Sequence, residues 1–197
     1  LGPDHPLFLT QYALVPIHGG GRLLDPRQLA LLQGEHSRQQ RREEGKFYVA
    51  GIDLAGEELP TEGYEPVRLP RRARDATAIV IAEVSAPPAE EALPVGPQIK
   101  VVELFTRTGV EHHQIYPEMV ALLKDLWACR RVVCDATGMG EVVASFLRGP
   151  LGSRVHGLKF TPQSKSELGF NLLAAVNSGR LKVCSGDGSA EYRQLMT

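Results

Sequence analysis

Residues 47–56 read Phe-Tyr-Val-Ala-Gly-Ile-Asp-Leu-Ala-Gly, an apolar run interrupted by a single acid, Asp53. A run of this kind is typical of a buried strand that is covered on both faces. A carboxylate in such a strand is costly unless something compensates its charge. A second acid, Asp135, ends another apolar run at residues 131–135. The predicted fold and function both depend on whether Asp53 and Asp135 meet.

Length and composition indicate a soluble, well-cored domain. The chain has 197 residues, 43% hydrophobic and 23% charged, and no apolar run approaches the roughly 20 residues of a membrane-spanning helix. The net charge of −1 argues against a protein that coats nucleic acid, although it leaves room for a local basic groove. The three cysteines lack zinc-site spacing, so we expect buried, reduced thiols in an intracellular protein. The start has neither a signal peptide nor an initiator Met, and we expect a fragment or a processed chain.

The pattern of apolar residues divides the chain into an extension and a core. Residues 1–46 are interpreted as an N-terminal extension and linker, with a short helix that begins at Asp25-Pro26 and a solvated polar stretch at 35–46. Residues 47–197 are interpreted as the core domain. Its strands are expected at 47–54, 75–84, 99–105, 132–135, 155–160 and 181–183. Its helices are expected over 119–127 after Pro117, from 138–141 to Gly149-Pro150, from Ser164 or Ser166 to 177, and from Ser189.

The order of these elements predicts an α/β fold. The first three strands follow one another without helices, through polar insertions at 56–74 and 87–97, and such neighbours are antiparallel. The later strands alternate with helices, which makes their neighbours parallel. We therefore predict a mixed central sheet, antiparallel in its first three strands and then parallel, flanked by helices.

The two strand-end acids support a metal-binding hypothesis. If the strand that ends at Asp135 lies beside the strand that ends at Asp53, both carboxylates project from the same edge of the sheet. They would repel, and each would raise the pKa of the other, unless a cation lay between them. Mg²⁺ and Mn²⁺ prefer oxygen ligands, and two such ions support in-line phosphodiester cleavage. Either acid alone is explained better as a turn residue at the end of a strand, but the two together favour metal binding.

Four stretches taken together resemble the nuclease domain of phage terminase large subunits, the DNA-packaging motors. They are the strand 47–55 with its Gly-Ile-Asp ending, Arg-Asp-Ala-Thr-Ala at 74–78, Cys-Asp-Ala-Thr-Gly-Met-Gly at 134–140, and the helix, Asn-Ser-Gly-Arg-Leu corner and strand at 165–183. Residues 7–34 also resemble the segment that joins the motor's ATPase to its nuclease. The resemblance implies a ribonuclease-H-like (retroviral-integrase-like) fold and an endonuclease that cuts concatemeric duplex DNA with two Mg²⁺ or Mn²⁺ ions.

The resemblance also assigns site residues. It makes Asp53 and Asp135 the catalytic, metal-ligating pair, and Asp75 a weaker third ligand that is explained nearly as well as a turn residue. The family's third essential acid lies on a helix beyond the last strand, and we expect it past Thr197. Asp187 is the one acid in reach to replace it, but its Gly-Asp-Gly setting is typical of a turn.

Basic residues and partners follow from the same resemblance. Arg71, Arg72 and Arg74, on the loop that enters the second strand, and Lys159 and Lys165 are candidates for DNA contact, with a solvated basic loop as an equal alternative. Duplex DNA is the implied substrate. In the full protein an N-terminal ATPase, a portal and a small terminase subunit are the implied partners, in the host-cell cytoplasm and without a membrane. This chain has no Gly-x-x-x-x-Gly-Lys-Ser/Thr phosphate loop, so we interpret it as the nuclease module alone.

Three alternatives remain open from the sequence. The chain is compatible with another ribonuclease-H-like nuclease, such as a junction resolvase or transposase, and with a catalytically incomplete DNA-binding or assembly module. Gly51 to Gly56 also partly mimics the phosphate-binding turn of actin-like ATP-binding domains. The short length, without a duplicated second half, argues against that last alternative.

Overall fold

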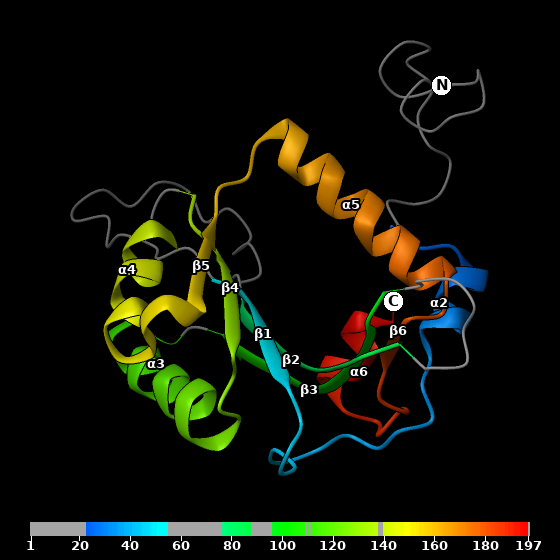
Figure 1. Cartoon of the computed structure of the whole chain (residues 1–197), viewed down its shortest axis with the longest axis horizontal. Helices are drawn as coiled ribbons and strands as arrows, with labels where there is room; N and C mark the ends of the chain where they lie inside the picture. Colours follow the sequence, from blue (N-terminus) through cyan, green and yellow to red (C-terminus); the bar gives the residue numbers. More distant parts are fainter. Residues whose placement is uncertain are drawn as a thin grey trace, which may run out of the picture.

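One mixed β-sheet forms the centre of the molecule (Figure 1). The computed structural model describes residues 23–54, 76–87, 96–108, 110, 112–137 and 140–196. Within these ranges the sheet has six strands in the order β5-β4-β1-β2-β3-β6. The strands are β1 (Tyr48–Asp53), β2 (Ala76–Ser85), β3 (Gln98–Thr108), β4 (Arg131–Asp135), β5 (Val155–Leu158) and β6 (Leu181–Val183).

Strand pairing agrees with the predicted fold class. β1 pairs with β2, and β2 with β3, in antiparallel fashion. β1 with β4, β4 with β5, and β3 with β6 are parallel pairs. The predicted mixed sheet, antiparallel in its first three strands and then parallel, is therefore confirmed.

Helices cover both faces of the sheet, as Figure 1 shows. On one face lie α3 (His112–Val120), the π-helix η1 (Ala121–Leu126) and α4 (Gly140–Leu151), which a short 3₁₀ turn η2 (Gly152–Arg154) connects to β5. On the other lie α2 (Pro26–Leu32), α5 (Pro162–Asn177) and α6 (Ala190–Leu195). None of the helices in the described ranges has the length and apolar character needed to cross a membrane.

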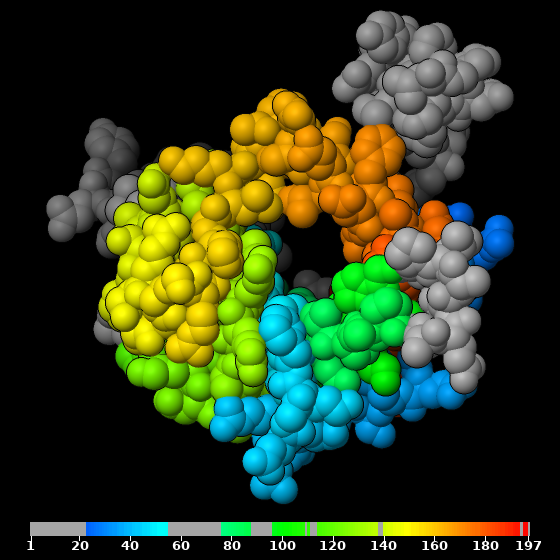
Figure 2. All heavy atoms as spheres, viewed as in Figure 1, coloured from blue at the N-terminus to red at the C-terminus, as the bar shows by residue number. Residues whose placement is uncertain are grey.

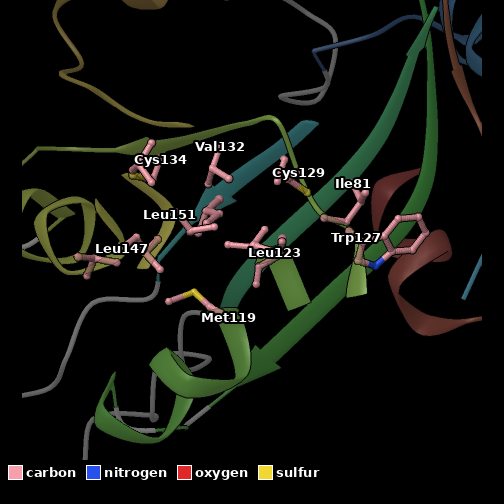
Figure 3. Close-up of a cluster of buried hydrophobic side chains, with 14 of the residues drawn as sticks. Ile81, Met119, Leu123, Trp127, Cys129, Val132, Cys134, Leu147 and Leu151 are labelled. Carbon is pink, nitrogen blue, oxygen red and sulfur yellow. The ribbon is translucent and has the colours of Figure 1, made fainter. Parts of the chain in front are cut away.

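The larger hydrophobic core lies between β1, β2, β4 and β5 and the helices α3, η1 and α4 (Figure 3). Trp127 is fully buried in it, with its ring edge-on to that of Tyr48 at a centroid separation of 5.2 Å. All three cysteines are buried and free, as predicted, and burial raises the pKa of the Cys129 thiol to about 12. These thiols therefore act as small apolar side chains.

Ahead of β1, residues 34–39 bond along the sheet, which the solvated linker predicted for 35–46 did not anticipate, whereas residues 40–46 are exposed as predicted. Gly34 donates its amide to the carbonyl of Val183, the His36 ring contacts the carbonyl oxygen of Val101, and Gln39 donates its amide to Val102. Composition misled the prediction, because these polar residues satisfy backbone groups along β3 and β6. The proposed division at residue 46 into extension and core stays a prediction.

Arg38 fixes this stretch by an ion pair to a buried acid on β3. Its guanidinium bonds to the Glu103 carboxylate, which is largely buried, and also donates to the carbonyl of Leu104 at 2.6 Å and to Asp187 at 3.1 Å. A buried carboxylate requires such compensation. The ion pair therefore joins the segment ahead of β1 to the far half of the sheet.

The predicted bounds of two helices were wrong because packing outweighed the local proline signal. The helix expected after Pro117 begins earlier, at His112, so that Pro117 lies inside α3, and the α pattern gives way to η1 at Ala121. α4 was expected to end at Gly149-Pro150 but continues to Leu151, which is buried in the core.

The start of α5 was also predicted too late. Thr161 is its N-cap, and Ser164 is the third helical residue, not the cap. The Thr161 hydroxyl accepts from the Ser164 amide at 3.1 Å, while the Ser164 hydroxyl accepts from the Thr161 amide at 2.8 Å. This reciprocal pair, followed by Pro162 in the first turn, is the capping-box pattern. The predicted cap Asp25 of α2 and the predicted start of α6 at Ser189 are confirmed, and Ser189 is the N-cap of α6.

We expect Arg38→Ala to lower the free energy of unfolding by about 3 kcal/mol, because it leaves the buried Glu103 carboxylate without its cation. Urea unfolding followed by circular dichroism measures the change. Arg107→Ala is the matched control, since Arg107 pairs with Glu118 at 3.5 Å on the surface and should change stability by less than about 1 kcal/mol. Equal losses in both variants would show that Glu103 does not depend on Arg38.

Candidate metal centre

The two predicted acids lie at the ends of neighbouring parallel strands. In the register of β1 with β4, Ile52 is the partner of Cys134, and Asp53 and Asp135 are the next residue of each strand. Neighbouring strands lie about 4.8 Å apart, and register partners point to the same face. The structure thus brings together the two acids on which the sequence-based hypothesis depends.

Both acids face away from the larger core. Along β1 the side chains of Tyr48, Ala50 and Ile52 are buried, whereas Asp53 is exposed. Along β4 the same alternation buries Val132 and Cys134, so that Asp135 shares the face of Asp53.

This acid-bearing face is open at β1 and β4. Gly51 is exposed, and Val133 retains 40% of its accessible surface. α5 and α2 cover the same face farther along, over β2, β3 and β6. Figure 2 shows an opening beneath α5 that is bordered by the strands. On this open part of the face Asp53 is exposed and Asp135 is half-buried.

The loop after β4 holds Asp135 in place. The Thr137 amide donates to Oδ1 of Asp135 at 2.7 Å, and the Thr137 hydroxyl accepts from the Phe160 amide at 3.1 Å. Gly140 opens α4 so close to the carbonyl oxygen of Asp135 that a Cβ at this position would collide with it. The first turn of α4 thus begins against the backbone of Asp135.

The donor set suits a hard divalent cation. Two carboxylates supply oxygen ligands of the kind that Mg²⁺ and Mn²⁺ prefer. Within the described ranges neither Asp53 nor Asp135 has a basic partner that would neutralise it. Across the same residues no third His, Cys, Asp or Glu joins them in a cluster. Asp75, the weaker candidate ligand, precedes β2 and lies outside the described residues.

Asp187 is engaged elsewhere and behaves as the predicted turn residue. Its Oδ1 accepts from the Ser189 amide at 2.8 Å, and its Oδ2 pairs with Arg38 at 3.1 Å. Hydrogen bonds from Ser189, and then the Arg38 guanidinium, hold the pKa of this carboxyl below its usual range. Asp187 follows β6, which β2 and β3 separate from β1. It is therefore no part of the acidic pair.

Of the basic residues predicted to contact DNA, the structure describes Lys159 and Lys165. Lys159 directly follows β5, whose Leu158 is the register partner of Asp135, and its ammonium lies 3.3 Å from the exposed Glu141 carboxylate. Lys165, in the first turn of α5, lies with its ammonium 5.5 Å from the centre of the Phe160 ring. Both lysines thus lie near the edge of the sheet that holds the acids. The remaining candidates, Arg71, Arg72 and Arg74, are outside the described residues.

Sequence reasoning missed one titratable residue on the acid-bearing face. His156 on β5 is exposed and is the register partner of Val133, two residues before Asp135 on β4. Its position on this face follows only from the pairing of β4 with β5. A four-residue strand gives no alternation long enough to indicate which way its histidine points.

The fold that holds this pair belongs to the ribonuclease-H-like class of α/β folds. Three antiparallel strands are followed by parallel strands on the β1 side, and helices lie on both faces. No family model and no curated protein matches the chain. Solved structures of phage large terminase nucleases do match it.

Three of these structures show the extent of the likeness. The large terminase nuclease from thermophilic phage G20c with bound zinc is 15% identical, with a TM-score of 0.55 over 82% of this chain and 81% of that one. The same nuclease with bound magnesium is 15% identical, with a TM-score of 0.56 over 82% and 74%. The nuclease domain of the Thermus phage P74-26 large terminase is 14% identical, with a TM-score of 0.53 over 82% and 72%. The resemblance to terminase nuclease domains is therefore confirmed for the fold.

We expect Gly140→Ala to destabilise the protein by about 1–3 kcal/mol and to displace the start of α4, because the new methyl group collides with the backbone at Asp135. Gly169→Ala in α5 is the control. It meets nothing within 4 Å, and as a helix-interior change it should raise stability by up to about 1 kcal/mol. Thermal unfolding measures both, and an unchanged midpoint for Gly140→Ala would contradict the close approach.

Proposed function

We propose that this chain is a metal-dependent DNA endonuclease domain of the phage or prophage packaging-terminase type. The observation that carries the proposal is the placement of Asp53 and Asp135 at the ends of adjacent parallel strands, on the open face of the sheet. Two carboxylates so close repel unless a cation lies between them. The terminase-nuclease fold supports the same class of reaction.

Asp53 and Asp135 are the proposed ligands of two Mg²⁺ or Mn²⁺ ions, with Asp75 as a proposed additional ligand. When bound, such ions lower the pKa of a water molecule and neutralise charge on the phosphodiester that is cleaved. The chain's own contribution is to orient the carboxylates. Thr137 holds Oδ1 of Asp135 by its amide, and the β1–β4 register fixes the spacing of the two strands.

Concatemeric duplex DNA is the proposed substrate. Lys159 follows β5, next to the register partner of Asp135, and Lys165 lies in the first turn of α5; their ammonium groups are proposed to contact phosphates near the cleaved bond. Arg71, Arg72 and Arg74 are proposed as further contacts. In this proposal the domain works in the host-cell cytoplasm with an ATPase domain, a portal and a small terminase subunit.

The central test is the nicking of supercoiled plasmid DNA in the presence of Mn²⁺. We expect the chain to nick the plasmid, and Asp53→Asn or Asp135→Asn to abolish nicking because each removes a charged ligand. Asp125→Asn is the matched control, since Asp125 is exposed on η1, on the opposite face of the sheet. Full activity in Asp53→Asn would overturn the proposal.

Two further measurements separate the alternatives. A strong preference for branched over linear duplex DNA would favour a nuclease of the junction-resolvase or transposase kind. Calorimetric titration with Mn²⁺ tests the metal site directly. If the chain binds DNA but no Mn²⁺ binds at Asp53 and Asp135 at millimolar concentration, it is a DNA-binding or assembly module.

Lys159→Ala and Lys165→Ala should weaken the binding of duplex DNA similarly for all sequences. Each should lower the slope of log affinity against log salt by about one, because one phosphate contact is lost. Lys124→Ala provides the control, because Lys124 is exposed on η1, across the sheet from the acids. Fluorescence anisotropy at several salt concentrations measures the slopes, and equal slopes for all three variants would remove the two lysines from the interface.

A further inference from the structure

An apolar groove of about 840 Å³ lies between α5 and the sheet, bordered by α2 and α6. Its lining consists of aliphatic side chains from three strands and three helices and from the residues just ahead of α2. Val80 in this lining is the register partner of Gly51, so the groove is on the same face of the sheet as Asp53. The lining residues are Leu23, Leu24, Leu29, Leu32, Val80, Ala82, Ile99, Val101, Leu104, Leu172, Leu181, Val183 and Leu195.

The groove is open to solvent at its rim. Leu23 retains 64% of its accessible surface and Leu195 retains 40%. Leu168, one turn before Leu172 on α5, retains 42%. Folded proteins rarely expose a contiguous aliphatic surface of this kind unless another segment or molecule covers it.

The walls of the groove are fixed by hydrogen bonds and do not need an occupant to form. Gln28 of α2 donates to the Asn177 side chain at the end of α5, at 3.2 Å. Lys182 of β6 donates its ammonium to the carbonyl of Leu31 at 2.7 Å. Such a preformed apolar site accepts a hydrophobic segment with little rearrangement.

We propose that residues 6–17 of this same chain occupy the groove. They read Pro-Leu-Phe-Leu-Thr-Gln-Tyr-Ala-Leu-Val-Pro-Ile, which is mostly apolar and contains no charged residue. The chain continues from them through His-Gly-Gly-Gly-Arg at 18–22 to Leu23 and Leu24, which line the groove. Five residues reach at most about 17 Å, so the apolar segment is tethered at the rim.

The tether favours this occupant over a second copy of the chain or another protein. A short tether gives the attached segment an effective concentration in the millimolar range. A competitor must exceed that concentration or bind correspondingly more tightly. This inference does not depend on DNA cleavage, because it uses only the lining of the groove and the chain that leads into it.

Photocrosslinking of the full chain tests the proposal. With p-benzoylphenylalanine in place of Tyr12, irradiation should give an intramolecular adduct that mass spectrometry maps to residues lining the groove. Leu172→Glu places a charge in the lining and should cause loss of this adduct. Val142→Glu is the matched control, since Val142 is exposed on α4, across the sheet, and the adduct should persist.

A second measurement avoids changing the folded part of the chain. Leu14→Asp should release the segment and raise the fluorescence of 8-anilinonaphthalene-1-sulfonate, which binds exposed apolar surface, whereas Gln11→Asp should leave it unchanged. Adducts that map outside the groove, or that join two copies of the chain, would overturn the proposal. The proposal would also be overturned if the dye fluoresced equally with the Leu14→Asp variant and with the unaltered chain.

Discussion

The parallel pairing of β1 with β4 is the constraint on which the rest of the structure depends. The two strands are far apart in the sequence, and they become neighbours only because α3 and η1 carry the chain across one face of the sheet between β3 and β4. The pairing buries Ala50, Ile52, Val132 and Cys134 together on that face. The stabilisation gained by this burial is what permits two like charges to stand side by side on the opposite face.

The two faces of the sheet therefore have different structural roles. One is packed against α3, η1 and α4 with a large buried core, and it fixes the backbone from which the acids project. The other is only partly covered, over β2, β3 and β6, and remains open at β1 and β4. A packed face behind an accessible face is the arrangement that the proposed site on DNA would require, because a duplex would have to approach the sheet itself.

Much of this arrangement could be predicted from the sequence because its signals are local. The apolar runs that end in Asp53 and Asp135 indicated both strands, and the order of elements indicated that the later strands have parallel neighbours. That these two strands pair with each other was only a condition of the metal hypothesis, and the structure supplies it. The sequence also predicted the N-cap of α2 at Asp25 and the start of α6 at Ser189. The features that could not be predicted from the sequence depend on contacts between residues that are far apart in the chain. Leu151 extends α4 past a proline because the core accepts its side chain, and His156 lies on the acid-bearing face only through the register of β4 with β5.

The attachment of residues 34–39 to β3 and β6 has a mechanical consequence. Tension applied to the chain ahead of α2 reaches the hydrogen bonds of Gly34 to Val183 and of Gln39 to Val102, together with the Arg38–Glu103 ion pair, before it reaches β1. These contacts are spread along two strands and would share the load. The strands that carry Asp53 and Asp135 are therefore shielded from a pull on the N-terminal side, and their spacing is preserved while the far edge of the sheet bears the force.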